Sequence, residues 1–381
     1  MKDEGWNIIE FWLTVLFYLG VLSVFTFAAN WRFLPTADPA YDGLQASGRV
    51  LHGFYGYHLQ HWDAGWYKQI SEQGYYGQAV SFFPAYPLLV HAVELGGLDF
   101  PVASSLVSLA VTLVGLYYFY KFALREMGDS RRAIRAVRWL LIFPTSFFLF
   151  APYTEGLFFA LLMIFLYYLN GQRYLYAALA ALAIALTRIT GVLVVVLVVG
   201  ELVRHWHEHA IRQRLIGLIA APFAGLIGYM VYLQAKFGDA FAFLHQQASW
   251  DRNITLTMAS FVERLSNYIH EFQLVFSTSN LAPIISRLTD VTFLIGGIII
   301  TVLIFARWRK DYGLWMLSMI AMPLMSGTLL GMPRFVLPLP FTYLFLAKFV
   351  KNETVIWMLM FSFAACWLWL LVQFSRGYWV A

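Results

Sequence analysis

Long apolar runs separated by short polar segments extend along almost the whole chain. A helix needs about 20 mostly apolar residues to cross a bilayer, and the runs predict eleven such helices. The predicted spans are 8–29, 101–124, 136–152, 154–170, 174–187, 189–203, 214–235, 289–306, 312–331, 335–350 and 354–373. The two spans that flank Arg188 are short, and a hairpin of tilted or partly buried helices fits them equally well. The pattern predicts an all-α polytopic membrane protein with a single transmembrane domain over residues 1–381.

The composition supports the membrane class and excludes several others. Hydrophobic residues make up 60% of the chain and charged residues only 12%, about half the charged share of a typical soluble domain. The formal net charge of +5 is too small to indicate nucleic acid as a partner. The single cysteine, Cys366, excludes an internal disulfide. No small-residue cleavage site follows the first apolar run, so we expect a retained span and not a removed signal peptide.

The positions of lysine and arginine predict which loops face the cytoplasm. With the N-terminus inside, 16 of the 26 cationic residues fall on short internal loops, in agreement with the positive-inside rule. Two long polar segments, 30–100 and 236–288, then lie outside. The apolar run 82–95 contains two prolines and two ionisable residues, and counting it as a span would place the arginines of 125–138 outside. We therefore expect 82–95 to be a re-entrant or interfacial helix within the first external loop.

The first external segment carries the main candidate for catalysis. Asp63 lies in the run HWDAGWY, residues 61–67. A carboxylate among aromatic rings and near lipid is costly unless it is paired or used in function. Aspartate is also a favoured N-cap, so Asp63 equally suits the start of a helix at Ala64. The two roles are compatible, and the sequence leaves both open.

Charged residues recur at the other predicted external turns. Tyr153 and Glu155 lie between two spans, Arg188 at the next external turn, and Arg334 at another. An arginine at membrane depth usually has an anionic partner, and its planar fork suits phosphate. Arg188 alternatively extends to the interface, and Arg334 alternatively bonds carbonyls at a helix end. Because both arginines fall on the same side of the membrane as Asp63, the pattern favours a phosphate site.

The second external segment contains amide, histidine and aromatic side chains of the kind that contact sugars. His245 and Gln246 are the candidates, within residues 237–250. An ordinary amphipathic loop helix is the simpler account of any single residue there. The histidine-rich tract 205–209 resembles a metal-binding sequence, but it falls inside and lacks a second group of ligands. We therefore expect a solvated helix end at 205–209 and no metal site.

Six motifs occur in order from about residue 61 to 346. They are HWDAGWY, GYYGQAVSFFPAYPLL, FPTSFFLFAPYTEGLF, ALTRITG, FGDAFAFLHQQASW and GMPRFVLPL. Together they resemble the PIG-V-like GPI mannosyltransferase II family and its prokaryotic relatives, which are polytopic enzymes of the GT-C glycosyltransferase class. The resemblance implies a GT-C-like fold, Asp63 as the catalytic carboxylate, and a polyprenyl-phosphate sugar donor. Family members commonly carry arginine just before the Trp-Asp pair, where this chain has His61.

The resemblance and the residues lead to one functional expectation. The protein is expected to move a hexose, with mannose as the family precedent, from a polyprenyl-phosphate donor to a lipid-linked or glycolipid acceptor. Transfer would occur on the extracytoplasmic side with inversion, and Asp63 would act as general base. The scheme requires no cofactor, and a divalent metal is compatible with it but not indicated. The expected contacts to donor phosphate are Arg188, Arg334 and His61, and those to substrate are Trp62, Trp66, Tyr67, Tyr153, Glu155, His245 and Gln246.

Two other functions stay open at this point. One is transport of a lipid or an anionic solute, although transporters often contain two related halves and this sequence has none. The other is a non-catalytic partner in a glycolipid assembly complex, which the sequence hardly distinguishes from the enzyme. The membrane is expected to be the plasma membrane in a prokaryote and the endoplasmic reticulum in a eukaryote.

Overall fold

The computed structural model describes residues 2–32, 57–250, 281–326 and 329–380, together with positions 266, 268, 269 and 273. Within these residues the protein is all-helical, with fifteen α-helices and several short 3-10 turns. The all-α class predicted from the sequence is confirmed.

Five helices are long and apolar enough to cross a membrane: α1 (Lys2–Arg32), α5 (Phe100–Met127), α10 (His209–Phe237), α13 (Leu281–Arg307) and α17 (Glu353–Ser375). Many of their apolar side chains point outward. Phe17 of α1 is 75% exposed and Phe361 of α17 is 77% exposed. Apolar surface of this extent suits contact with lipid, and it indicates a multi-pass integral membrane protein. The five helices match five of the predicted spans.

The other six predicted spans correspond to shorter helices. They are α6 (Ser130–Leu141), α7 (Thr154–Asn170), α8 (Tyr174–Ala185), α9 (Val194–Arg204), α14 (Lys310–Ser326), and the pair α15 (Met332–Val336) and α16 (Pro340–Phe349). The predicted helix over 136–152 is not continuous. Helix α6 starts earlier, where the Asp129 side chain accepts a hydrogen bond from the Arg131 backbone N–H. It ends at Leu141, before Pro144, because a proline disfavours helical geometry in the residue that precedes it.

Helix α7 lies at the centre of the bundle. Twelve of its seventeen residues are buried, and α7 packs against α5 and α8. Gly115 of α5 allows the close approach, since a Cβ there would lie 3.0 Å from the Cα of Ala160. Phe119 and Phe159 pack edge to face beside this contact. This packing fixes the position of α7 and of the residues at its two ends.

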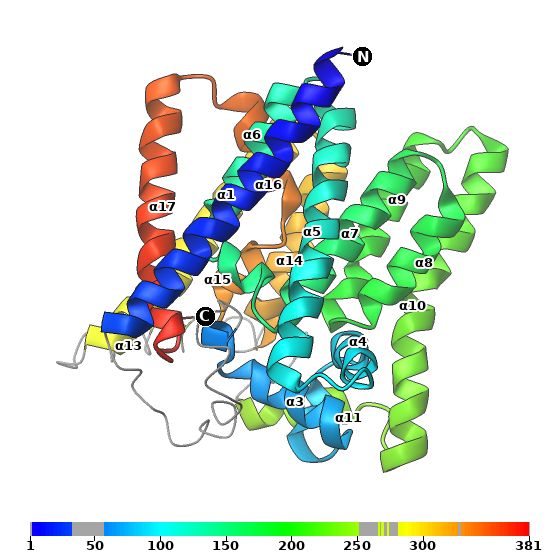
Figure 1. The fold of residues 1–381 in the computed structure, drawn as a ribbon. Coiled ribbons are helices and arrows are strands. Elements are labelled where there is room, and N and C mark those ends of the chain that lie inside the picture. Colours follow the sequence, from blue (N-terminus) through cyan, green and yellow to red (C-terminus); the bar gives the residue numbers. More distant parts are fainter. Residues whose placement is uncertain are drawn as a thin grey trace.

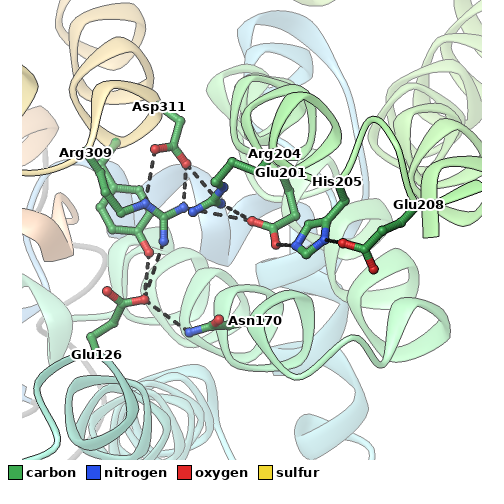
Figure 2. Close-up of polar contacts among 9 residues, drawn as sticks. Glu126, Asn170, Glu201, Arg204, His205, Glu208, Arg309 and Asp311 are labelled. Carbon is green, nitrogen blue, oxygen red and sulfur yellow. Dashed lines mark hydrogen bonds and ion pairs between the residues drawn. The ribbon is translucent and has the colours of Figure 1, made fainter.

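One end of the bundle, which we call the N-terminal end, is held by charge pairs. Figure 1 places the N-terminus at this end, opposite α3 (Asp63–Gln73) and α4 (Ala85–Glu94). Figure 2 shows Arg309 forming two hydrogen bonds with Asp311, at 3.1 and 2.5 Å, while Glu126 accepts from Asn170. Arg204 joins Asp311 to Glu201. Arg309 Nη1 also lies 3.6 Å from Glu126 Oε1, so these contacts connect the ends of α5, α7, α9 and α14.

Helix α4 occupies the region predicted to be re-entrant or interfacial. Its ten residues extend about 15 Å, roughly half of a hydrocarbon core of about 30 Å. Tyr86 is fully buried against α5 and its hydroxyl lies 2.8 Å from the Ser108 hydroxyl, whereas Leu88 and Leu89 are exposed. Helix α4 is therefore too short to cross a bilayer alone.

Candidate functional site

The end of the bundle opposite the N-terminus is called the α3 end below. A cavity of about 580 Å³ lies there. Stretches far apart in the sequence form its wall. The lining residues are Trp62, Asp63, Trp66, Tyr67, 81–83, Thr154, 187–190, Phe243, Leu244, Gln247, Ser249, Met322, Pro323, Ser326, Leu330, Gly331, Arg334, Phe335 and Trp379. A concave site with aromatic walls and few polar groups is the usual form of a ligand pocket. Asp63, Arg188 and Arg334 all line it.

Asp63 is the first residue of α3. The helix begins at Asp63 itself and not at Ala64, so Trp62 holds the N-cap position and makes no capping side-chain bond. The backbone of Trp62 has φ 53° and ψ −109°, a region that non-glycine residues rarely adopt and that costs about 1–3 kcal/mol. The sharp turn places the Trp62 ring and the Asp63 carboxylate on the same cavity. A carboxylate in the first turn of a helix is also favoured by the helix dipole.

Two arginines and two carboxylates form one connected network in this site. Arg334 Nη1 lies 2.8 Å from Asp63 Oδ2, and Arg334 Nε donates to Glu155 Oε1 at 2.7 Å. Arg188 Nη1 donates to the same Glu155 oxygen at 3.0 Å. The Glu155 side chain is 0% exposed, whereas that of Asp63 is 22% exposed. Glu155 is therefore an interior counter-ion for both arginines, and Asp63 is the carboxylate that reaches the cavity.

Arg334 is held in place by its backbone neighbours. It lies on the short helix α15, after Gly331, whose φ of 86° favours glycine. The Met332 N–H donates to the buried Asp290 carboxylate at 3.2 Å, and the Thr145 hydroxyl donates to the Pro333 carbonyl at 3.2 Å. Contacts on both sides of Arg334 therefore restrict the direction of its guanidinium group.

Glu155 and Arg188 are positioned by two closely packed turns. Glu155 is the second residue of α7, and a Cβ on the next residue, Gly156, would collide with the Leu149 carbonyl. Arg188 follows α8, and a Cβ on Gly191 would collide with the Ile184 carbonyl. Glycine in the YTEG and TRITG motifs therefore permits the approach that brings the two charged side chains together.

Aromatic side chains cover much of the remaining cavity wall. Trp62 and Trp379 meet edge to face, with centroids 5.1 Å apart. Trp66 stacks on Phe82 at 5.8 Å, and Tyr67 meets the same ring edge to face at 5.4 Å. Burial raises the pKa of the Tyr67 hydroxyl well above its usual range, so this hydroxyl is a neutral hydrogen-bonding group. The predicted substrate contacts Trp62, Trp66 and Tyr67 all line the cavity.

Three other predicted contacts support the cavity from behind and do not line it. Glu155 is one of them. The Tyr153 side chain is buried, its hydroxyl donates to the His61 carbonyl at 2.7 Å, and its ring lies 4.6 Å from the Arg334 guanidinium carbon. The His61 ring packs edge to face on Phe374. Burial lowers the pKa of His61 to about 4, so the imidazole is neutral at pH 7 and is not a cation for phosphate.

The predicted contacts in the second external segment lie at the edge of the site. The His245 side chain is 68% exposed and its Nδ1 lies 2.7 Å from Asp239 Oδ2. His245 and Gln246 are not among the residues that line the cavity, whereas Phe243, Leu244 and Gln247 are. The backbone of 243 also accepts a long hydrogen bond from Ser81 at 3.5 Å. The segment thus forms part of the wall, with neighbours of the predicted residues facing inward.

Sequence reasoning missed two parts of the wall. Trp379, after the last apolar helix, and the turn of α14 around Pro323 and Ser326 both line the cavity. A tryptophan in a polar stretch, RGYW, and a proline inside an apolar run were the available signals. Neither the tryptophan nor the proline indicates a site from the sequence alone, because only the fold brings them to the same cavity as Asp63.

The geometry supports binding of an anionic ligand that also carries an apolar or ring-shaped part. Arginine forks suit phosphate, the tryptophans offer flat apolar faces, and Asp63 offers one accessible carboxylate. In the part of the chain that the structure describes, no three histidine, cysteine, aspartate or glutamate side chains are grouped to hold a metal ion. No protein family model matches the chain, and no curated protein matches its sequence.

Proposed function

We propose that the protein is a membrane glycosyltransferase that moves a hexose from a polyprenyl-phosphate donor to a glycolipid or lipid-linked acceptor. The observation that carries this proposal is the meeting of Asp63, Arg188 and Arg334 in one aromatic cavity. The resemblance of the same motifs to the PIG-V-like mannosyltransferases supports mannose as the sugar. It also supports a GT-C-like arrangement, in which the shorter helices complete about eleven crossings.

The proposed reaction needs one base and a stabilised leaving group. The acceptor hydroxyl attacks the anomeric carbon of the donor sugar while Asp63 takes the hydroxyl proton. The bond between that carbon and the phosphate oxygen breaks through an oxocarbenium-like state. The bonding electrons leave with the phosphate, and the arginines stabilise the charge that develops on it. Attack from the face opposite the phosphate inverts the anomeric configuration.

The distribution of charge supports an extracytoplasmic site. Arg204 and Arg309 belong to the charge pairs of the N-terminal end, Arg125 donates to the Tyr167 carbonyl near the end of α7, and Arg138 pairs with Glu10 in the first part of α1. By the positive-inside rule, the N-terminal end faces the cytoplasm. A sugar carried on a membrane lipid can reach a site at the α3 end without a nucleotide sugar on that side of the membrane. The scheme requires no cofactor.

Transfer by the purified protein tests the proposal. We expect protein in lipid nanodiscs to move label from radiolabelled polyprenyl-phosphate mannose into a membrane lipid extract, and Asp63→Asn to lower the rate by roughly 10²–10⁴-fold. Asp99→Asn is the matched control, because Asp99 is an exposed carboxylate at the start of α5, makes no capping side-chain bond and does not line the cavity. No labelled product from the wild-type protein, or full turnover by Asp63→Asn, would refute the proposal. Passage of labelled donor across proteoliposomes without product would identify a transporter instead.

A further inference from the structure

The two carboxylates that contact Arg334 differ in how freely they can leave it. Glu155 is fully buried and accepts hydrogen bonds from both Arg334 and Arg188 through Oε1. Asp63 makes its contact with Arg334 through Oδ2 and Nη1, lies on the cavity wall, and is partly exposed. Moving Glu155 away would leave two arginines without an interior counter-ion. Moving Asp63 requires only a rotation of its side chain into the cavity.

We propose that the donor phosphate displaces Asp63 from Arg334, so that Asp63 becomes a free base only when the site is loaded. This inference rests on the proposed function and specifies how the site is regulated. In the empty site, Arg334 Nη1 is occupied by Asp63. A phosphate oxygen that takes this nitrogen forms a comparable charged hydrogen bond. The released carboxylate then points into the cavity, where the acceptor hydroxyl binds.

The charges of the site agree with such an exchange. In the empty site, two guanidinium groups face two carboxylates and their charges cancel. A phosphodiester donor adds one negative charge, so the phosphate and Asp63 compete for Arg334. During transfer the acceptor proton moves to Asp63 and the leaving phosphate gains a second negative charge, so the total charge in the site stays constant. After the product leaves, the proton passes from Asp63 to solvent and the carboxylate contacts Arg334 again.

Glu155 is a positioning residue in this proposal. It touches neither the cavity nor the donor, and it holds both guanidinium groups while Arg334 changes its other partner. Tyr153 and Phe148 contribute ring faces at 4.6 and 5.4 Å from the Arg334 guanidinium carbon, which further limits movement of the cation. The arginine therefore stays fixed while the aspartate moves.

Binding of a phosphate lipid that carries no sugar tests the exchange. Farnesyl phosphate is titrated against protein in nanodiscs. If Asp63 competes with phosphate for Arg334, Asp63→Asn binds the probe roughly threefold to tenfold more tightly than wild type. Arg334→Ala binds it at least about tenfold more weakly, and the Asp99→Asn control matches wild type. Asp63→Ala serves as a second variant should the asparagine protein fold poorly.

Two results would overturn the exchange: unchanged or weaker binding by both Asp63 variants, or unchanged binding by Arg334→Ala. The assay needs no transfer, so its outcome is separable from that of the proposed function. If the wild-type protein transfers no sugar but the Asp63 variants bind the probe more tightly, the exchange stands and the glycosyltransferase proposal is refuted.

Discussion

Arg334 bridges Glu155 and Asp63 by directing Nε to the buried Glu155 carboxylate and Nη1 to the partly exposed Asp63 carboxylate. The bridge joins the start of α7, the start of α3 and the short helix α15, which are distant in the sequence. A side chain with two nitrogens at fixed spacing is needed to hold both contacts at once. The two contacts therefore require a guanidinium group and not only a positive charge, and a substitution can test this requirement.

We predict that lysine cannot replace Arg334. A single ammonium group keeps the positive charge but cannot reproduce the two directed contacts, so Arg334→Lys should lower sugar transfer by about 10²-fold, and Arg334→Ala by about 10²–10³-fold. Initial rates at saturating acceptor measure the effect. Arg214→Lys, which changes an exposed arginine near the start of α10, is the control and should retain wild-type rates. Near-normal transfer by Arg334→Lys would mean that the fork geometry is unimportant.

Glu155→Gln tests the buried counter-ion Glu155 independently of Asp63, the carboxylate at the cavity. With a neutral amide at position 155, Arg334 and Arg188 lack their buried anion. Removing one member of a buried ion pair typically lowers the free energy of unfolding by about 3–5 kcal/mol. We expect a clearly lower unfolding midpoint and loss of transfer. Glu353→Gln, which changes an exposed carboxylate at the start of α17, should change neither. An unaltered midpoint for Glu155→Gln would show that Glu155 is not a structural counter-ion.

The sequence predicted the charged centre of the site better than its surroundings. Asp63, Arg188 and Arg334 stood out because ionised groups among apolar residues are costly, and the fold brings all three together. Sequence spacing could not distinguish exposed from buried neighbours, so Glu155 was expected to contact substrate but is buried beneath the arginines. The end of α6 at Leu141 was missed, and the helix was predicted to continue to 152, because an apolar run has no visible period, although Pro144 marked the end. The count of eleven crossings stays a prediction beyond the five long helices.

Trp379 offers a test of the aromatic wall. Its ring meets Trp62 edge to face and lines the cavity, where it would cover one face of a bound sugar or lipid headgroup. Trp379→Ala should lower kcat/KM by about tenfold, and Trp379→Phe should retain most of it because a flat apolar face remains. Trp357→Ala, on the outward side of α17 and 69% exposed, is the control for loss of a tryptophan. Equal effects of alanine at 379 and 357 would exclude a specific role for the wall.

The buried His61 predicts a dependence of stability on pH. Its pKa is lowered by burial to about 4 in the folded protein, against about 6.5 in an unfolded chain. Between pH 4 and 6.5 the unfolded state binds a proton at His61 that the folded state does not bind. The contribution of His61 to the free energy of unfolding is therefore fully present above pH 6.5. It falls by about 2–3 kcal/mol as the pH drops toward 4. Carboxylates also titrate there, so the informative quantity is the difference between wild type and His61→Gln. Unfolding midpoints measured from pH 7 to 4.5 should fall more steeply for wild type, and parallel curves would mean that His61 is protonated equally in both states.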